Sequence, residues 1–499
     1  MSNTSLWEAI SIRNTPYPIL ENDLEVDVAI IGGGITGITA ANQLVSTGKK
    51  VVILEANTLG GGTTGNSTGN LYVAIEPYYQ TVEATFNFET AKTIAYSRKA
   101  AIDYIEKNVK EKDIDCHFTR RPWYAYTTKE AKKLEREVEL FNKMGMPIEY
   151  TDNMPLDIKF KKAAVMQDQA RFNPLQYVIA MAADLAKKGC LIFENTPVIE
   201  IVETEHGILK TAHATITAKK ILIATHTPVG INSTQMFTAP YRSYVVAVKL
   251  ENCPEGHFWD VSGISPSICT HAMSQNHPEL LMVAGNHHKT GQGSDLMQNF
   301  EKHEAFLRKN FNTKDVAFQW SAQHYQSADS APYIGLNGSA QHTYIASGFW
   351  ADGLTYGTLA GIIVGDLILG KNNPLSATYQ PDRKKMMTSM PFVLKENANV
   401  LLQYLKDYPL ISLQNFDDIK PGEGKVIEIN REKCAVSRDD NNLLHVVSAV
   451  CTHMKCIVNW NDAEKTWDCP CHGSRFTCKG KVIEGPAILD LEIKPEHPK

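Results

Sequence analysis

The 499-residue chain lacks several features that would associate it with a membrane or with nucleic acid. It has no uninterrupted apolar stretch of the length that a bilayer-spanning helix requires. Its net charge is −5 and it carries no basic run or tail, so a nucleic-acid partner is not expected. The first 18 residues have no basic segment followed by an apolar core, so we expect no signal peptide. We therefore expect a cytoplasmic protein with neither a membrane nor a nucleic-acid partner.

Cysteine is scarce in most of the chain and concentrated near its end. Six of the ten cysteines lie between Cys434 and Cys478. The other four are scattered, as buried thiols of a cytosolic protein would be: Cys116, Cys190, Cys253 and Cys269. Apart from this, the chain is 43% hydrophobic and 21% charged, the composition of an ordinary globular protein. Cysteine chemistry is therefore expected in the C-terminal region.

Two short loops in that region each offer one thiolate and one imidazole. They read CTHMKC over residues 451–456 and CPCHGS over residues 469–474. A 2Fe–2S cluster that has two cysteines on one iron and two histidines on the other needs this set of ligands. The predicted ligands are Cys451, His453, Cys469 and His472. Since imidazole ligands raise the reduction potential of such a cluster, the chain is expected to transfer single electrons.

A zinc site with two cysteines and two histidines is the alternative. Structural zinc ligands usually come as C-x2–4-C paired with H-x3–5-H, whereas cysteine and histidine alternate in these loops. The order of the ligands therefore favours the iron–sulfur cluster. The two loops, including the string CPCHGS, resemble those of the Rieske family. That resemblance implies that the remaining loop cysteines, Cys456 and Cys471, form a disulfide over the cluster.

Residues 26–55 contain the parts of a dinucleotide-binding unit. An apolar run at 26–31 predicts a buried parallel strand, helical apolar spacing follows, and a second strand at 51–54 ends at Glu55. The turn before the helix contains G-x-G-x-x-G as Gly32, Gly34 and Gly37. These glycines permit a pyrophosphate to approach the helix N-terminus, and Glu55 stands where it can accept from ribose hydroxyls. The alternative is a glycine-rich turn that binds no ligand. Such a turn would not require a strand, a helix, a second strand and an acidic residue in this order.

Three further segments distinguish FAD from NAD. Residues 60–70 carry small and hydroxyl side chains, including Thr63 and Thr64, that can contact a pyrophosphate and the edge of a ring. Residues 219–227 read as a buried strand, and residues 344–370 read as a strand, a glycine-rich turn and a helix. These segments resemble the D-amino-acid-oxidase-like superfamily of FAD amine oxidoreductases, which includes glycine, sarcosine and γ-glutamylputrescine oxidases. The resemblance extends from Leu6 to Tyr379.

This resemblance implies further contacts with the cofactor. It directs the N-terminus of the last helix at the pyrimidine end of the flavin, where backbone N–H groups stabilise negative charge. The residues that it adds to the cofactor site are Val198, Thr225, Gly348, Gly353, Leu354 and Thr355. Because residues 60–70 contain neither histidine nor cysteine, we expect FAD to be bound without a covalent link.

Together the two resemblances predict a chain of three parts. Residues 1–385 would form an α/β Rossmann-like FAD-binding domain interleaved with an α+β substrate domain. Residues 386–412 would form a linker with an amphipathic helix over 393–408. Residues 413–499, with short strand patterns separated by turns, would form a small all-β Rieske 2Fe–2S domain.

The substrate-binding residues are less well marked by the sequence. In the amine oxidoreductases that the chain resembles, an arginine often pairs with a carboxylate, which makes Arg242, with Tyr244 nearby, the candidate. A surface or interdomain salt bridge is the alternative for Arg242. Trp350 is a candidate for the wall of the pocket, with plain packing as the alternative. The adjacent His287 and His288 would point to opposite faces of a strand, so we do not expect them to share a metal.

These parts predict an FAD-dependent amine or amino-acid dehydrogenase or oxidase with a built-in electron outlet. A small-molecule amine or amino acid would give hydride to the flavin, and the cluster would pass electrons to an external one-electron acceptor. The alternative is a reductase component that takes electrons from NAD(P)H or ferredoxin. Such proteins usually carry a second G-x-G-x-x-G motif. Residues 291–293 read Gly-Gln-Gly, which is only the first part of that motif. A redox sensor without turnover is a third alternative.

Overall fold

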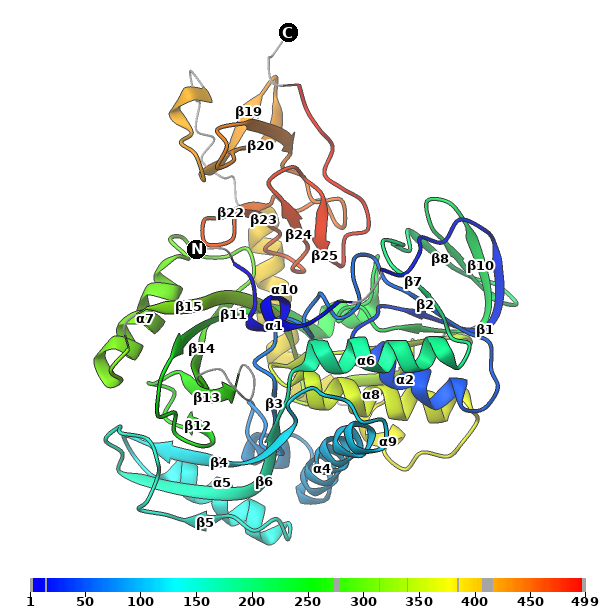
Figure 1. Cartoon of the computed structure of the whole chain (residues 1–499). Coiled ribbons are helices and arrows are strands. Elements are labelled where there is room, and N and C mark those ends of the chain that lie inside the picture. The colour runs from blue at the N-terminus through cyan, green and yellow to red at the C-terminus, as the bar shows by residue number, and fades with distance from the viewer. Residues whose placement is uncertain are drawn as a thin grey trace.

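The computed structural model describes residues 3–13, 16–272, 279–313, 315–338, 340–383, 386–405 and 416–495. A large body carries a smaller C-terminal part, which stands at one end of it (Figure 1). In the large body, two sheets lie side by side, with helices packed mainly around the first. The second sheet is built from segments that alternate along the chain with those of the first, as an interleaved pair of domains requires.

The first sheet has eight strands and a parallel centre. Its main path runs β16 (Tyr333–Leu336), β17 (Thr343–Ser347), β10 (Thr215–Ile223), β1 (Leu24–Ile31), β2 (Val51–Leu54) and β7 (Leu191–Phe193). The pair β8 (Glu200–Glu203) and β9 (Gly207–Lys210) joins it through β10. All four residues of β2 are buried, and the last four of β1 as well, because helices or loops cover both faces of a parallel sheet.

The second sheet has ten strands and is almost entirely antiparallel. Its path runs β18 (Phe349–Trp350), β15 (Val316–Ser327), β11 (Thr238–Lys249), β14 (Glu279–Lys289), β13 (Ser267–Ala272), β12 (His257–Asp260), β4 (Thr119–Thr127), β6 (Lys162–Arg171) and β3 (Asn70–Leu71). The short β5 (Glu149–Tyr150) pairs with β6. The two sheets approach each other where β17 leads through Gly348 into β18. That junction positions the cavity described below.

Helices of the large body fall into a central group and a peripheral group. The central group comprises α2 (Ile35–Val45), α4 (Phe88–Glu111), α6 (Pro174–Lys187) and α8 (Gly353–Ile368). Helix α2 packs against both α6 and α8, and three glycines of α8 allow a close approach to α2. The peripheral helices are α1 (Leu6–Ile10), α3 (Tyr79–Thr85), α5 (Lys132–Lys143), η1 (Ser233–Phe237), α7 (Gln298–Asn310) and α9 (Ser376–Tyr379).

The C-terminal part is built from two small antiparallel sheets. The first contains β19 (Gly424–Ile429), β20 (Glu432–Arg438) and β21 (Leu444–Ser448), and η2 (Phe416–Asp418) precedes it. The second contains β22 (Asn459–Asn461), β23 (Thr466–Asp468), β24 (Arg475–Thr477) and β25 (Val482–Glu484). The predicted fold class is thereby confirmed in both halves, including the small all-β C-terminal part.

The connecting helix α10 (Met386–Leu405) begins seven residues before the predicted start at 393. It includes Pro391, and residues 406–408 of the predicted helix lie outside the described residues. Helix α10 is attached to the large body, because Lys289 of β14 pairs with Glu396 and donates to Asn399. The domain boundaries at 385 and 413 remain predictions.

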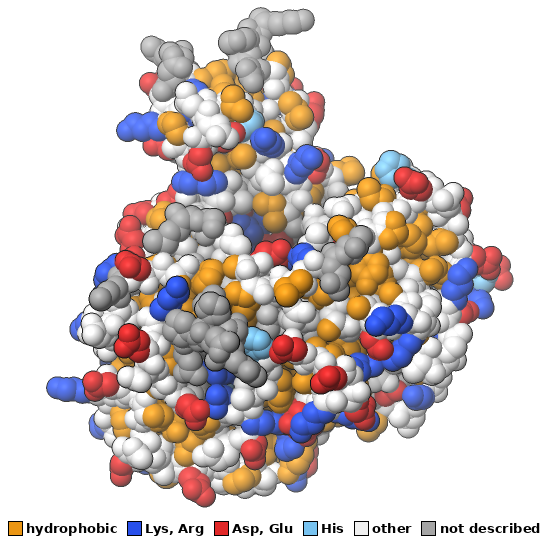
Figure 2. All heavy atoms as spheres, viewed as in Figure 1, with side chains coloured by type: hydrophobic (Ala, Val, Ile, Leu, Met, Phe, Trp, Pro, Cys, Tyr) orange, Lys and Arg blue, Asp and Glu red, His pale blue; other side chains and the backbone are white. Residues whose placement is uncertain are grey.

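Lys and Arg side chains are interspersed with Asp and Glu on the face shown in Figure 2. Among the described residues, none of the helices has both the length and the apolar character needed to cross a membrane.

Candidate functional site

The turn between β1 and α2 forms a cradle for a phosphate. Gly32 has a φ of +105°, and a Cβ there would lie 2.7 Å from the Ala224 carbonyl oxygen, so only glycine fits. A Cβ on Gly37 would collide with the Gly32 carbonyl, which accounts for the third glycine. Gly34 is the N-cap of α2 and brings no capping side chain, while the Thr64 hydroxyl accepts from the Ile35 N–H at 3.2 Å. The other N–H groups of this first turn are suited to bind an anion.

The acidic residue at the end of β2 supports this cradle. Glu55 accepts hydrogen bonds from the Gly33 N–H at 2.8 Å and from the Asn57 N–H at 2.9 Å. Burial raises the pKa of its carboxyl, while these hydrogen bonds act to lower it. Glu55 therefore stabilises the turn and also presents its carboxylate at the cavity wall.

A cavity of about 1330 Å³ extends from this cradle to the second sheet and the C-terminal part. Ten of the twelve predicted FAD residues line it: Gly32, Gly34, Glu55, Thr63, Thr64, Val198, Thr225, Gly353, Leu354 and Thr355. Gly37 and Gly348 are not among its described lining residues. Gly348, with a φ of +77°, instead forms the turn from β17 into β18, where a Cβ would lie 3.0 Å from Ser327 Cβ.

The N-terminus of α8 opens into the same cavity. Asp352 precedes the helix but does not cap it, within the described part of the chain. Its carboxylate accepts from Arg98 at 3.2 Å and from the Glu76 N–H at 3.2 Å. Burial raises the pKa of Asp352 to about 6, although Arg98 acts to lower it. The N–H groups of Gly353 and Leu354 are consequently available to a ligand, and the residues present would fit the pyrimidine end of a flavin.

The four predicted cluster ligands lie together in the C-terminal part. Cys451 and Cys469 are buried, and the rings of His453 and His472 are 5.0 Å apart. His453 Nε2 lies 3.1 Å from the Gly230 carbonyl oxygen and can donate to it, which leaves Nδ1 free for a metal. His472 Nδ1 is buried without a hydrogen-bond partner among the described residues. Two thiolates and two imidazole nitrogens so arranged fit a 2Fe–2S cluster.

The other two loop cysteines are joined. Cys456 and Cys471 form a disulfide that links the two ligand loops, as the resemblance implied. They lie near Cys469, so three cysteine sulfurs come together, but two of these sulfurs are consumed by the disulfide. An alternative zinc site formed by these three cysteines is therefore excluded.

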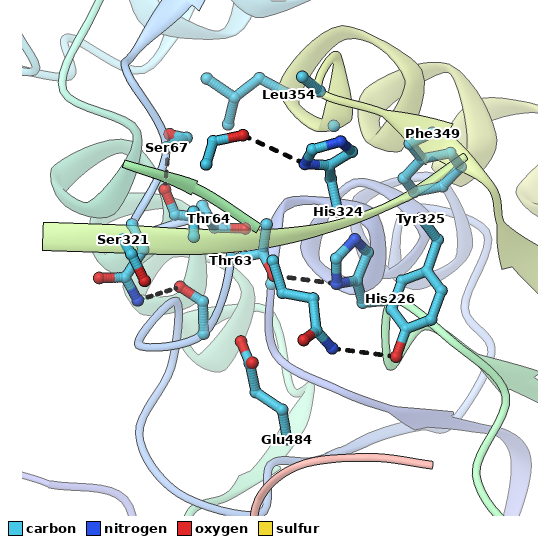
Figure 3. A pocket seen from close by; sticks show the side chains of 18 of the residues that line it. Thr63, Thr64, Ser67, His226, Ser321, His324, Tyr325, Phe349, Leu354 and Glu484 are labelled. Carbon is cyan, nitrogen blue, oxygen red and sulfur yellow. Dashed lines mark hydrogen bonds between the residues drawn. The ribbon is translucent and has the colours of Figure 1, made fainter. Parts of the chain in front are cut away.

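The cluster loops face the cavity through a short series of side chains. Thr63 Oγ1 lies 3.0 Å from His226 Nδ1, and the ring of His226 is 4.9 Å from that of Tyr325 (Figure 3). The Tyr325 hydroxyl donates to the His472 carbonyl at 3.2 Å. Burial lowers the pKa of His226 to about 4, so its imidazole is neutral at pH 7. Protein atoms in contact therefore connect the flavin-side wall to a cluster ligand.

A buried group of charges fixes the C-terminal part to the second sheet. Arg242 of β11 pairs with Glu464 at 2.7 Å and with Glu484 at 3.3 Å. Arg475 of β24 pairs with the same two carboxylates and with Asp468. Because these carboxylates compensate its charge, Arg242 can be fully buried, with 0% of its surface exposed.

The substrate role that the sequence favours for Arg242 does not fit this geometry. Alternate residues of β11 point to opposite faces, and Ser243 and Val245 line the cavity while Arg242 and Tyr244 do not, among the described residues. Arg242 corresponds to the alternative interpretation, an interdomain ion pair. Tyr244 packs in an apolar cluster with Phe300. Trp350 does line the cavity, and its indole N–H donates to Ser327 at 2.9 Å.

Several cavity residues were not predicted. His226 directly follows the predicted Thr225, so its position at the end of a strand was a signal that could have been used. Tyr325, Glu76 and His324 have no local motif and meet only through the fold. His287, considered with His288 for a metal, lines the cavity, whereas His288 stacks on Tyr244 at 5.6 Å.

Comparison with known proteins agrees with this geometry. Residues 27–367 match the family described as FAD dependent oxidoreductase (DAO). The chain belongs to this family. Residues 410–494 match the Rieske [2Fe-2S] domain, so the cofactors of this DAO-family protein are FAD and a 2Fe–2S cluster.

Its relatives share one or both halves. YhfW of Bacillus subtilis (strain 168), whose name describes a Rieske 2Fe-2S iron-sulfur protein, is 35% identical over 486 residues, 95% of this chain and 94% of YhfW. The γ-glutamylputrescine oxidoreductase of Escherichia coli (strain K12) is 25% identical over 236 residues, 46% of this chain and 55% of that protein. The structure of glycine oxidase from Geobacillus kaustophilus shares the fold, with a TM-score of 0.60 at 20% identity, over 72% of this chain and 99% of that one.

Proposed function

We propose that this DAO-family protein oxidises an amine or an amino acid and delivers the electrons through its Rieske domain to an external one-electron acceptor. When bound, FAD supplies a two-electron acceptor and the 2Fe–2S cluster a one-electron relay. The observation that carries the proposal is that one cavity reaches from the dinucleotide cradle to Gly485 and Glu484 of the Rieske domain. The oxidoreductases of glycine and of γ-glutamylputrescine that resemble the large body support an amine substrate.

The chain's own residues would prepare and enclose the substrate. Tyr72, Trp259 and Trp350 give the substrate side of the cavity apolar walls, which exclude water from the reacting carbon. Neutral His226 would hold Thr63 in place beside the cofactor. The Tyr325 hydroxyl, which lies within donating distance of the carbonyls of His472 and Gly485, would keep this side of the Rieske domain at the cavity. Buried thiols outside the cluster loops, such as Cys116, Cys190 and Cys269, are compatible with a cytoplasmic location, which we retain as part of the proposal.

A reductase that takes electrons from NAD(P)H is the alternative. Residues 291–293, which have the first two glycines of the motif but not the third, lie against the cluster loop: a Cβ on Gly291 would be 2.6 Å from the Pro470 nitrogen. They therefore serve the contact between domains, which leaves this segment unsuited to bind a second dinucleotide.

Anaerobic stopped-flow mixing separates the two functions. Oxidised holoenzyme is mixed with a panel of amines and amino acids and, in parallel, with NADH and NADPH. The proposal expects flavin bleaching with a member of the amine panel, followed by the spectral change of cluster reduction. Rapid bleaching by a nicotinamide nucleotide, with none by any amine, would favour the reductase and overturn the proposal.

A further inference from the structure

Three side chains converge in the cavity on the side away from the Rieske domain. Glu76 follows β3, His287 lies on β14 and His324 lies on β15. One ligand atom from each lies within 4.8 Å of the other two, and His287 Nε2 is 3.4 Å from Glu76 Oε1. Two neutral imidazoles and a carboxylate are a ligand set that proteins use for zinc and for ferrous iron with open coordination positions.

The two imidazoles are held from behind by one hydroxyl. Ser243 Oγ lies 2.7 Å from His287 Nδ1 and 3.3 Å from His324 Nδ1. Ser243 belongs to β11, which runs between β14 and β15, so the three side chains share one face of the sheet. A serine oxygen can accept from both Nδ1–H groups. In that tautomer both Nε2 atoms carry a lone pair, and such support is what metal-bound histidines receive.

The buried member of the set has an unsatisfied nitrogen. His324 is 4% exposed, and its Nε2 has no hydrogen-bond partner among the described residues. Burial, with nearby histidines and Arg242, lowers its pKa well below the ordinary value, so the ring is neutral at pH 7. A buried polar atom without a partner is unfavourable, so a ligand that occupies it is favoured. Figure 3 shows His324 among the side chains that line the cavity.

The geometry is close to that of a bound ion. Metal–nitrogen and metal–oxygen distances of about 2.0–2.2 Å place neighbouring ligand atoms about 3–3.5 Å apart, and the His287–Glu76 separation of 3.4 Å already meets this. The side chain of His287 is 37% exposed and lines the cavity, so it has room to adjust its position when an ion binds. The second carboxylate oxygen of Glu76 accepts from the Ala351 N–H at 3.3 Å, which fixes the carboxylate.

We propose that Glu76, His287 and His324 bind one divalent transition-metal ion whose open positions face the substrate side of the cavity. The ion would take an anionic oxygen ligand, in particular the carboxylate of a substrate. This last step rests on the proposed function, whereas metal binding itself does not. The bound ion would supply positive charge to the substrate side of the cavity. Arg242 does not supply it, because its guanidinium is paired with Glu464 and Glu484.

Zinc retention by intact holoenzyme tests the site. Protein is dialysed against Zn²⁺ and then against metal-free buffer, and zinc, iron and acid-labile sulfide are counted per chain. The sulfide count shows that zinc has not replaced the cluster. The proposal expects about one zinc per chain with about two sulfides, and an iron-to-sulfide ratio near three to two if iron fills the site instead.

Variants locate the ion. Glu76→Gln and His324→Ala should abolish zinc retention, and Ser243→Ala should weaken zinc affinity about 10- to 100-fold. The matched control is His288→Gln, the neighbour of His287 on the opposite face of β14, which should retain zinc as the parent does. Acetate should then raise the zinc-dependent melting temperature only in proteins that retain zinc.

Two outcomes would overturn the proposal. One is a holoenzyme that retains no metal beyond its cluster iron. The other is zinc retention that survives both Glu76→Gln and His324→Ala. Metal retention together with no turnover of any amine would leave the site established and remove the proposed function alone.

Discussion

At the scale of single residues, burial and charge decide what each candidate can do. Arg242 is an arginine next to two tyrosines, a pattern that fits a substrate anchor, yet its partners Glu464 and Glu484 lie more than 200 positions away in the sequence. Local pattern could identify Gly32 and Cys451 because their roles depend on neighbours in the chain. It could not identify the partner of Arg242, because that partner is set by how two domains dock.

The buried carboxylate of Glu464 gives a prediction for stability. Burial acts to raise the pKa of the Glu464 carboxyl. The neighbouring Arg242 and Arg475 outweigh burial and lower this pKa to about 2, from an ordinary 4.5. Glu464→Gln should reduce the free energy of unfolding at pH 7 by on the order of 3 kcal/mol, because Arg242 and Arg475 lose one of the carboxylates that compensate their buried charges. Thermal or denaturant unfolding followed by circular dichroism measures this.

The sign of its pH dependence follows from the lowered pKa. The carboxylate contributes stability above pH 4.5 and loses that contribution as the pH falls toward 2. The difference between parent and Glu464→Gln should therefore be constant from pH 7 to 5 and shrink below pH 4.5. Glu304→Gln, which removes an exposed pair with Arg308, is the control and should change stability by less than about 0.5 kcal/mol. An equal effect of both substitutions would contradict the account.

The disulfide gives a second prediction. Cys456 and Cys471 are separated by 15 residues in the sequence. A disulfide that closes a loop of this size stabilises the folded protein by about 3 kcal/mol. The double variant Cys456→Ser, Cys471→Ser should fold but lose its cluster faster, as followed by visible absorbance on heating. Cys434→Ser, a buried thiol of the same domain outside the ligand loops, is the control. Cluster loss at the same rate in all three proteins would show that the disulfide does not hold the loops.

At the scale of elements, the sequence was most informative where a ligand or a buried strand imposes a local pattern. The strand–turn–helix–strand unit of β1, α2 and β2 and the two cluster loops could be read directly. Helix α10 begins seven residues before the predicted start and includes Pro391, a residue type that the interior of a helix usually excludes. The sites formed between elements, such as Ser243, His287 and His324 on three neighbouring strands, leave no periodic signal in the sequence.

The turn after β14 gives a prediction at this scale. Gly291 has a φ of +68°, and a Cβ there would lie 2.6 Å from the Pro470 nitrogen and 2.7 Å from the Asp468 oxygen. Gly291→Ala should therefore push the Rieske domain away from the large body, which limited proteolysis after α10 or small-angle scattering would detect. Gly263→Ala is a matched control, because its φ is +71° and no described atom lies within 4 Å of the added Cβ. Both variants carry the same backbone strain, so equal behaviour would mean that the contact with the cluster loop is unimportant.

At the scale of the whole molecule, the arrangement joins two cofactor sites through one cavity. The order of the domains could be predicted because each has its own motif. Their docking could not, since the contacts of Arg242, Gly291 and Tyr325 with the Rieske domain involve residues far apart in the chain. The docked state is what makes transfer within one chain reasonable, because the series from Thr63 through His226 and Tyr325 ends at a cluster ligand.

The most direct test of this account is laser-flash photoreduction of anaerobic holoenzyme with a deazaflavin sensitiser. The flash reduces the flavin, and the decay of its signal is compared with the appearance of the reduced cluster. The account predicts that the cluster is reduced at the rate at which the flavin signal decays, and that this rate is unchanged when the protein is diluted tenfold. A rate that falls in proportion to the dilution, or a cluster that stays oxidised while the flavin remains reduced, would contradict it.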